Sequence, residues 1–290
     1  MLTLSELSPQ AITEMLALAE PGAAGTPLSG KGVALLFEKP SARTRHSMEM
    51  AVVGLGGHPV YVRADEVGIG GRESVEDVAR TFACYHSIVA ARVKDHGVLE
   101  AMQAAIPDTP VLNMLSDTAH PLQGLADLLT VKQLRGSIEG AKIAFIGDGN
   151  NVARSLAEGA SKLGAEFVLA APKGYEFPDE IAAMDGVTQT DDPRAAAEGA
   201  DFVYTDVWVS MGQDEETQAR AAAFRPYQVD EALMACATPD AKFLHCLPAI
   251  RGQEVTAPVI DGPQSAVWRQ AENRLHSARG ALAWLMGERA

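Results

Sequence analysis

Cysteine is scarce in this sequence of 290 residues. The three cysteines, Cys84, Cys236 and Cys246, form no CxxC pair and leave an odd count. A scattered, odd set argues against a disulfide framework and is typical of a reducing compartment. His245 stands next to Cys246 rather than at metal-ligand spacing, and no other pair completes a zinc pattern. We therefore expect free thiols and no structural metal.

Long apolar runs are also missing. No stretch approaches the roughly 20 apolar residues that a membrane-spanning helix needs. The first residues, Met1-Leu-Thr-Leu-Ser-Glu6, lack the basic and apolar regions of a signal peptide. We therefore expect a cytoplasmic protein that has no membrane partner.

Positive charge is in deficit, because 24 Lys and Arg residues face 38 Asp and Glu residues, giving a net charge of -14. Nucleic acids and anionic membranes are bound through basic patches, so neither is expected as a partner. An anionic small molecule would require a local basic pocket. In such a pocket, the attraction between the anion and nearby cationic side chains acts at short range. It outweighs the repulsion from surface carboxylates, which salt largely screens.

Short apolar or β-branched runs alternate with Ala-rich, amphipathic stretches along most of the chain. This alternation is typical of an α/β fold built on parallel sheets. Ser8-Pro9 is a typical helix start, with Ser as the cap and Pro in the first turn. Strands are predicted at 32–37, 59–62, 87–90, 110–113, 142–147, 166–170, 202–205 and 242–245.

The length predicts two domains, each a parallel sheet flanked by helices. A helical pattern over 122–134 ends before Arg135-Gly136-Ser137, and a new strand follows. The boundary is therefore placed between residues 134 and 135. A last helical pattern begins near residue 271 and is expected to return to the first domain. The first domain is then 1–134 with 271–290, and the second is 135–270.

Hydroxyls and guanidiniums are concentrated in Ser41-Ala-Arg-Thr-Arg45, just after the first predicted strand. A helix beginning there would offer unpaired backbone N–H groups and partial positive charge to a phosphate. Arg43 and Arg45 would add charge-assisted bonds, and Ser41 and Thr44 would add hydroxyl donors. Taken alone, the segment is explained as well by a Ser-capped surface helix.

A second glycine-containing turn, Gly147-Asp-Gly-Asn-Asn151, follows the strand at 142–147 and invites comparison with dinucleotide-binding loops. The third glycine of that motif would fall at Val152, and the next strand is followed by Ala171-Pro172 instead of an acid. Two of the three requirements fail, so a nicotinamide cofactor is not expected. The Asn amides suit a carboxylate and an amine instead.

Five segments lie after predicted strands or at helix starts, where α/β proteins gather ligand-binding groups. They are Ser41-Ala-Arg-Thr-Arg45, His120-Pro-Leu-Gln123, Asp148-Gly-Asn-Asn151, Asp206-Val-Trp-Val-Ser-Met-Gly212 and His245-Cys-Leu-Pro248. In this combination and order the chain resembles the ornithine carbamoyltransferases of the aspartate/ornithine carbamoyltransferase family. Arg72-Glu-Ser-Val-Glu-Asp77 and Ala271-Glu-Asn-Arg-Leu-His276 extend the resemblance over nearly the whole chain.

The resemblance implies a site for carbamoyl phosphate. Its members are Ser41, Ala42, Arg43, Thr44, Arg92, His120, Gln123, Cys246, Leu247 and Arg274. His120 is expected to hold the carbamoyl oxygen and Gln123 the carbamoyl nitrogen, and Arg92 is a second phosphate-site arginine. Arg92, His120 and Cys246 are the expected catalytic residues. Fixed donors of this kind stabilise a developing oxyanion and a leaving phosphate without a covalent nucleophile.

The resemblance also implies a site for L-ornithine, made of Asn151, Asp206, Ser210, Met211 and Cys246. Asp206 and Ser210 correspond to residues that hold the α-ammonium, and Asn151 and the Met211 backbone to those that hold the carboxylate. Cys246 and the Leu247 carbonyl would contact the δ-amine. That amine must lose a proton before it attacks, because its reference pKa is about 10.4.

Three positions depart from the family pattern. Ala42 stands where Thr is usual, Gly68 where Gln is common, and Ile250 where His is frequent. If the threonine hydroxyl that Ala42 lacks would bind phosphate, about 0.5–1.5 kcal/mol is lost with it. Arg72 is a hypothetical substitute for the missing Gln side chain.

Other functions remain open at this point. Putrescine lacks the carboxylate that Asn151 would hold, N-acetylornithine lacks the ammonium that Asp206 would pair with, and aspartate would need further basic groups. A non-catalytic relative is a further alternative, since Asp206, Cys246 and Arg274 each have an ordinary structural explanation when taken singly. The resemblance further implies a homotrimer in arginine metabolism, without a cofactor.

Overall fold

The computed structural model describes residues 1–69, 71–209 and 217–290. The chain divides into two compact units. Unit 1 contains Met1–Leu129 and Asn273–Ala290, and unit 2 contains Thr130–Glu272. Both boundaries lie inside helices, α6 (Pro121–Arg135) and α13 (Val267–Leu285), so each of these helices contributes to both units.

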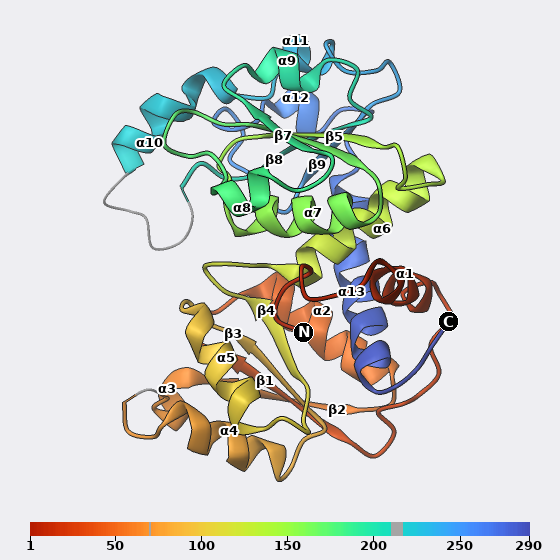
Figure 1. Cartoon of the computed structure of the whole chain (residues 1–290), viewed down its shortest axis with the longest axis vertical. Coiled ribbons are helices and arrows are strands. Elements are labelled where there is room, and N and C mark those ends of the chain that lie inside the picture. The colour runs from red at the N-terminus through yellow and green to blue at the C-terminus, as the bar shows by residue number, and fades with distance from the viewer. Residues whose placement is uncertain (70, 210–216) are drawn as a thin grey trace. The chain divides into compact units, whose positions relative to one another are not determined.

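Unit 1 contains a four-stranded parallel sheet in the order β2-β1-β3-β4 (Figure 1). Its strands are β1 (Gly32–Phe37), β2 (His58–Arg63), β3 (Ile88–Arg92) and β4 (Val111–Leu115). β1 has β2 on one side and β3 on the other, so the strand order reverses at β1. Ligands of such sheets bind outside the carboxyl ends of the strands at this reversal.

Helices cover both faces of this sheet. They are α1 (Pro9–Leu18), α2 (Ala42–Gly54), α3 (Ala64–Val67), α4 (Val75–Ala83) and α5 (His96–Ala105), with parts of α6 and α13. Because strand side chains alternate between faces, Leu36 and Ala91 face α4 and α5 in one apolar cluster. α1 and α13 lie side by side, so closely that a Cβ at Gly280 would collide with the Met15 carbonyl (Figure 1).

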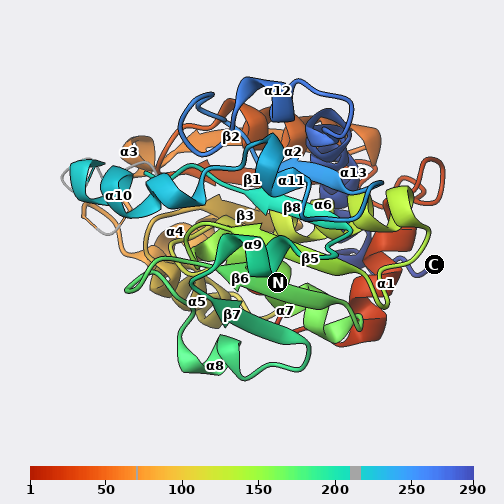
Figure 2. The same ribbon diagram turned by 90° about the horizontal axis from the view of Figure 1, so that it is seen from above.

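Unit 2 contains a five-stranded parallel sheet in the order β7-β6-β5-β8-β9, of which β7, β6, β5 and β8 are labelled in Figure 2. The strands are β5 (Lys142–Ile146), β6 (Glu166–Ala170), β7 (Val187–Thr190), β8 (Phe202–Thr205) and β9 (Lys242–His245). β5 stands between β6 and β8, so the order reverses here as well.

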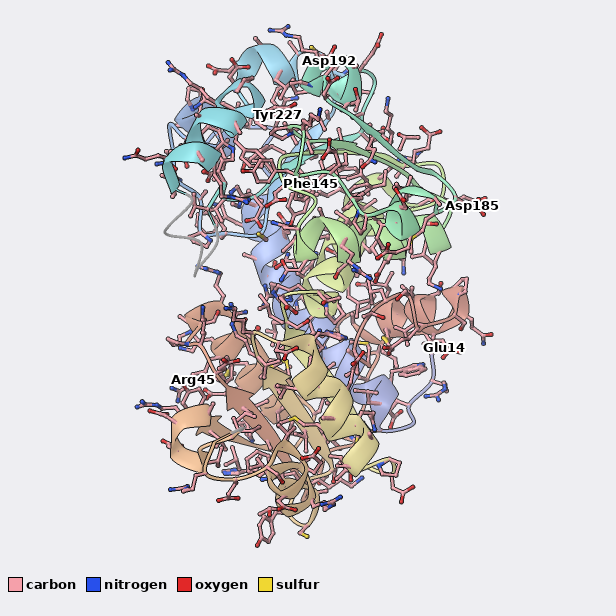
Figure 3. The ribbon with its side chains drawn as sticks, turned by 60° about the vertical axis from the view of Figure 1, so that its left-hand side comes forward. Glu14, Arg45, Phe145, Asp185, Asp192 and Tyr227 are labelled. Atoms are coloured by element: carbon pink, nitrogen blue, oxygen red, sulfur yellow. The ribbon has the colours of Figure 1, made fainter. Side chains whose placement is uncertain are left out.

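The helical segments of unit 2 are short apart from α7. They are α7 (Asn151–Lys162), α8 (Asp179–Ala182), α9 (Pro193–Ala197), α10 (Thr217–Phe224), α11 (Glu231–Met234), α12 (Ala257–Ile260) and the 3-10 turn Arg225–Tyr227. Phe145 is fully buried and stacks on Phe167 and Tyr204. Asp185 and Asp192, in contrast, lie on the exposed surface of unit 2 (Figure 3).

The predicted α/β class is confirmed, as is the return of the last helix to the first part of the chain. One strand was not predicted, because β7 is a short edge strand in which Val187 alone is buried. α13 also begins at Val267, four residues before its predicted start. Within the described residues, no helix has the length and apolar character required to cross a membrane.

Candidate active site

Three neighbouring strands of unit 1 end at the residues that form its polar cluster. β1 leads through a turn to Ser41, β3 ends at Arg92, and β4 leads to His120. Because β1, β3 and β4 are parallel neighbours, their carboxyl ends share one edge of the sheet. Residues that are distant in sequence therefore meet there.

Ser41 is the cap of α2, as the sequence predicted. Its hydroxyl accepts a bond from the Thr44 amide at 3.4 Å. Thr44 is 1% exposed, and its hydroxyl oxygen accepts bonds from Arg92 at 3.4 Å and from Arg274 at 3.1 Å. The first turn of α2 thus fixes a hydroxyl between two guanidiniums.

Arg274, on α13, is the central residue of the cluster. Besides Thr44, it donates to the Gln123 side-chain oxygen, and its Nη1 lies 3.4 Å from His120 Nε2. The Gln123 amide nitrogen in turn donates to Asp127 at 2.8 Å. Since a guanidinium can only donate, the Nε2 of His120 must be the acceptor of its contact with Arg274.

Burial and neighbouring cations change the protonation equilibria of this cluster. Burial, with Arg274 and Arg43 nearby, lowers the pKa of Arg92 to about 10, so Arg92 stays charged at neutral pH. Burial, followed by Arg274 and Arg92, holds the pKa of His120 well below its usual value. The cluster therefore combines fixed positive charge with a neutral imidazole, a combination suited to binding an anion next to a polarised carbonyl.

The structure brings together Ser41, Thr44, Arg92, His120, Gln123 and Arg274. Arg43 is exposed and acts electrostatically on Arg92, and Ala42 is exposed at the first position of α2. Arg45, labelled in Figure 3, has other partners. It binds Glu49 at 2.8 Å and stacks 3.9 Å from the Tyr61 ring centre. The suggestion that Arg45 adds an anion contact is therefore wrong.

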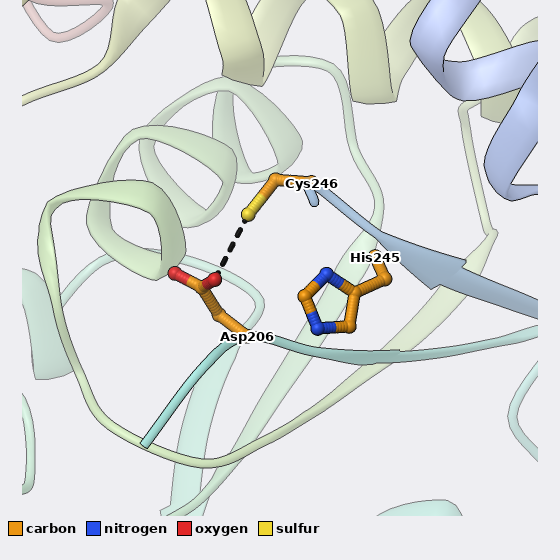
Figure 4. A group of neighbouring side chains, drawn as sticks. All are labelled: Asp206, His245 and Cys246. Atoms are coloured by element: carbon orange, nitrogen blue, oxygen red, sulfur yellow. Dashed lines mark hydrogen bonds between the residues drawn. The ribbon is translucent and has the colours of Figure 1, made fainter. Parts of the chain in front are cut away.

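In unit 2 the neighbouring strands β5, β8 and β9 end at a second polar cluster. Asp206 directly follows β8, and Cys246 directly follows β9 (Figure 4). The Cys246 thiol donates to one Asp206 oxygen at 3.0 Å. The same oxygen accepts from the Val207 amide at 2.8 Å, and the other accepts from Asn150 at 2.9 Å. Asp206 is thus held rigidly by these partners.

Asn150, which the sequence analysis did not assign, connects two of these strand ends. Its side-chain oxygen caps α7 by accepting from Val152 and Ala153, while its amide nitrogen reaches Asp206. Asn151, the predicted residue, is the half-buried first residue of α7. The helix-cap position in Gly149-Asn150-Asn151 is the sequence signal that identifies Asn150.

Arg220 is a second residue that the sequence analysis missed. It is 3% exposed, donates to the Trp208 carbonyl at 2.6 Å, and forms an ion pair with Asp148. Its guanidinium also lies 4.7 Å from the Tyr175 ring centre. Arg220 therefore links the turn after β5 to the segment after β8. An arginine within an Ala-rich helix carries no pattern that distinguishes it from a surface position.

His245 lies beside Asp206 and Cys246, and these three residues offer ligand atoms within 4.8 Å of one another. The donor set nevertheless does not suit a metal. The Nδ1 of His245 accepts from the Leu247 amide at 2.9 Å, and Nε2 contacts Glu254 at 3.2 Å. Both ring nitrogens are engaged, so a cation would have to displace one of these bonds.

The remaining predicted positions are Leu247, Ser210 and Met211. Leu247 is half-buried and has a left-handed backbone, with φ of 59°. Ser210 and Met211 lie outside the described residues. The departure at Gly68 has a structural reason, because its φ is 64° and a Cβ there would lie 2.8 Å from the Cβ of Arg72.

The sequence matches two models of one family. The aspartate/ornithine carbamoyltransferase carbamoyl-P binding domain matches residues 1–133, and the Asp/Orn binding domain of the same family matches residues 139–285. The anabolic ornithine carbamoyltransferase of Pyrococcus furiosus is 47% identical over 269 residues, covering 90% of this chain and 85% of that protein. The ornithine carbamoyltransferase of Bacillus subtilis is 45% identical over 294 residues, covering 97% and 92%.

Solved structures agree with the sequence matches. Ornithine carbamoyltransferase from Pyrococcus furiosus superimposes with a TM-score of 0.94 at 42% identity, covering 100% of this chain and 97% of that one. The Thermus thermophilus enzyme gives a TM-score of 0.92 at 44% identity, with coverages of 99% and 98%. With both family models matched over nearly its whole length, the chain belongs to the aspartate/ornithine carbamoyltransferase family.

Proposed function

We propose that this protein is an enzyme that transfers the carbamoyl group of carbamoyl phosphate to the δ-amine of L-ornithine, giving L-citrulline and phosphate. One observation carries the proposal beyond family membership. Arg274 joins Thr44 of α2 to His120 and Gln123 at the start of α6, so that three segments distant in sequence meet in one buried cluster. Such a cluster offers donors at once to a phosphate and to a carbonyl oxygen.

In unit 1 we assign the phosphate group to Ser41, the backbone at Ala42, Arg43, Thr44 and Arg92. Arg274 is a further anion-binding arginine. His120 and Gln123 are assigned to the carbamoyl oxygen and nitrogen. The nitrogen of Gln123 donates to Asp127 and its side-chain oxygen accepts from Arg274, so the oxygen is the atom of this amide that would accept a bond from the carbamoyl nitrogen. Domain 1–134 with 271–290 is thus the proposed carbamoyl-phosphate domain, and 135–270 the proposed ornithine domain.

In unit 2 we assign the α-ammonium of ornithine to Asp206 and Ser210, and its carboxylate to Asn151 and the Met211 backbone. Cys246 and the Leu247 carbonyl are assigned to the reacting groups, which are the δ-amine of ornithine and the carbamoyl group of carbamoyl phosphate. The hydrogen bond from the Cys246 thiol to Asp206 supports this assignment, because it orients a sulfur atom next to the ammonium-binding carboxylate.

The reaction forms a bond from the δ-nitrogen to the carbonyl carbon and breaks the bond from that carbon to the phosphate oxygen. The phosphate leaves with the electron pair of the broken bond and takes up the proton that the neutral amine loses as it attacks, so that the products are citrulline and hydrogen phosphate. Arg92 and Arg274 would stabilise the leaving phosphate. A neutral His120 would donate to the developing oxyanion once its Nε2 no longer accepts from Arg274 and the ring proton has moved from Nδ1 to Nε2. No cofactor enters this balance.

The decisive assay measures citrulline or its analogue from carbamoyl phosphate, with ornithine, putrescine and N-acetylornithine offered side by side. We expect ornithine to be preferred strongly, because Asp206 and Asn151 have no role with an acceptor that lacks an α-ammonium or a carboxylate. No turnover with ornithine at saturating substrate would reject the proposal. Turnover with putrescine alone would support a different acceptor.

We further propose a cytoplasmic homotrimer that acts in arginine biosynthesis. The three free cysteines support a reducing compartment, and one relative is named as anabolic. Exposed Met50 and Val53, one turn apart on α2, support contact with another copy of the chain. Sedimentation equilibrium tests the assembly, and a mass equal to a single chain at micromolar concentration would refute it.

A further inference from the structure

Glu254 is a buried carboxylate with no role in the proposed chemistry. It is fully buried, and its Oε1 accepts from His245 Nε2 at 3.2 Å and from the Ile250 amide at 2.5 Å. Its other oxygen is buried without a hydrogen-bond partner among the described residues. Because burying a carboxylate in this way is unfavourable, the position requires a compensating purpose.

The hydrogen bonds around His245 determine which ring nitrogen carries the proton. The Leu247 amide points to Nδ1 at 2.9 Å, and an N–H group can only donate. Nδ1 must therefore be unprotonated, and the ring hydrogen sits on Nε2, where it is donated to Glu254. Glu254 thus selects the tautomer of His245 that accepts the Leu247 amide.

Leu247 needs that acceptor. Its φ of 59° is the single left-handed value among the described non-glycine residues, and this conformation is disfavoured for a side chain with a Cβ. The bond to His245 Nδ1 holds the amide of this residue in place. The same segment carries the Cys246 thiol, which is itself aligned on Asp206.

We infer that Glu254 and His245 are positioning residues that orient the Cys246 thiol and the Leu247 carbonyl from behind, without touching substrate. The inference rests on the proposed carbamoyl transfer for its kinetic consequences. Its structural content, a hydrogen-bond chain of fixed direction from Leu247 through His245 to Glu254, is independent of any reaction. The His245 main chain is fixed separately, since its amide donates to Gln270 at 2.8 Å.

Two substitutions of His245 distinguish the role of its Nδ1 from that of its Nε2. The side-chain oxygen of His245→Asn can take the place of Nδ1, whereas the longer amide of His245→Gln reaches the place of Nε2 and leaves the Leu247 amide unpaired. We expect kcat to stay within about threefold for His245→Asn and to fall by at least about tenfold for His245→Gln. The KM for carbamoyl phosphate should change by less than about threefold in both.

Glu254 offers a matched pair as well. In Glu254→Gln the Ile250 amide keeps the carbonyl oxygen of Gln pointing at His245, so the tautomer and kcat should be retained within about threefold. In Glu254→Leu the acceptor is gone and kcat should fall by about tenfold or more. If Glu254→Leu does not fold, the comparison of His245→Asn with His245→Gln decides the question.

The alkylation rate of Cys246 by iodoacetamide, followed by peptide mass mapping to exclude Cys84 and Cys236, gives a readout that needs no turnover. His245→Gln should change this rate by about fivefold or more, while His245→Asn should leave it near that of the unmodified protein. Equal rates and equal kcat values in the two variants would overturn the inference. If the unmodified protein makes no citrulline, the proposed function fails, and the alkylation comparison still tests the positioning role.

Discussion

At the scale of single residues, the polar cluster of unit 1 depends on geometry as much as on charge. Arg274 contacts Thr44, Gln123 and His120 at once, which requires the flat, forked donor set of a guanidinium. Lys has the charge of Arg274 without the fork. Charge and geometry can therefore be separated by a single substitution.

Arg274→Lys should lower kcat/KM for carbamoyl phosphate by roughly 30- to 1000-fold, because about 2–4 kcal/mol of directed hydrogen bonding is lost while the charge remains. Steady-state kinetics at saturating ornithine measure this. Arg45→Lys is the matched control, since Arg45 binds Glu49 and should change kcat/KM by less than about threefold. Equal effects of the two substitutions would contradict the assignment of Arg274.

Ala42 is the departure whose effect can be measured most directly. Ala42→Thr adds a hydroxyl at the start of α2 and should tighten carbamoyl phosphate binding by about 0.5–1.5 kcal/mol, or roughly two- to tenfold. Ala42→Val is the control, because it has the shape of Thr without the hydroxyl. Identical affinities for the two variants, measured by titration calorimetry, would show that only the backbone at this position binds phosphate.

His120 should make stability depend on pH. Because folding lowers the pKa of His120, the unfolded chain binds a proton more readily than the folded chain. The stabilisation is fully present above the unfolded pKa of about 6.5 and is lost as the pH falls below it, by at most about 1.4 kcal/mol per pH unit. Urea unfolding of His120→Asn between pH 7.5 and 5.5 should show a shallower slope than the unmodified protein. A slope that does not change would contradict the burial of a neutral His120.

At the scale of elements, the beginning of α7 combines two tasks in Asn150, a helix cap and a bond to Asp206. Asn150→Ala should lose both, and Asn150→Ser should restore the cap alone. We expect the Ala variant to lose about 0.5–2 kcal/mol of unfolding free energy and the Ser variant much less. In both, the KM for ornithine should rise while that for carbamoyl phosphate stays unchanged. An ornithine KM that recovers in Asn150→Ser would show that Asp206 does not need this bond.

Periodicity in the sequence predicted the elements well wherever an apolar run marks a buried strand. β1, β6, β8 and β9 begin and end at the predicted residues. β7 was not predicted, because Thr188 and Gln189 are exposed and its sequence therefore contains no apolar run. Edge strands pair through their backbone, and that pairing leaves little trace in side-chain type.

The same limit applies to the site. Residues at strand ends, such as Thr44 and Asp206, could be predicted because parallel topology brings strand ends together. Arg220 and Glu254 could not, since their partners Asp148 and His245 are set by the tertiary path of the chain. Arg45 illustrates the opposite error, because a local motif does not reveal which neighbour a side chain will bind.

At the scale of the whole molecule, each unit has its own polar cluster, and hydrogen exchange can test the two separately. Carbamoyl phosphate alone should slow exchange at 41–45 and 120–124 of unit 1. Adding norvaline, which is ornithine without the δ-amine, should slow exchange at 150–154 and 206–209 of unit 2. Mass spectrometry of peptic fragments reports both. Protection by norvaline confined to unit 1 would contradict the assignment of ornithine to unit 2.

Arg274 also determines when the polar cluster of unit 1 can form during synthesis. It lies 230 residues beyond Thr44 and 151 beyond Gln123, and its segment belongs to unit 1 although unit 2 separates them in the chain. A ribosome releases residue 274 after all of unit 2, so the nascent chain carries Thr44, Arg92 and His120 for most of translation without the arginine that joins them. Binding of carbamoyl phosphate to the complete cluster therefore cannot stabilise the folded form of unit 1 until synthesis is nearly finished.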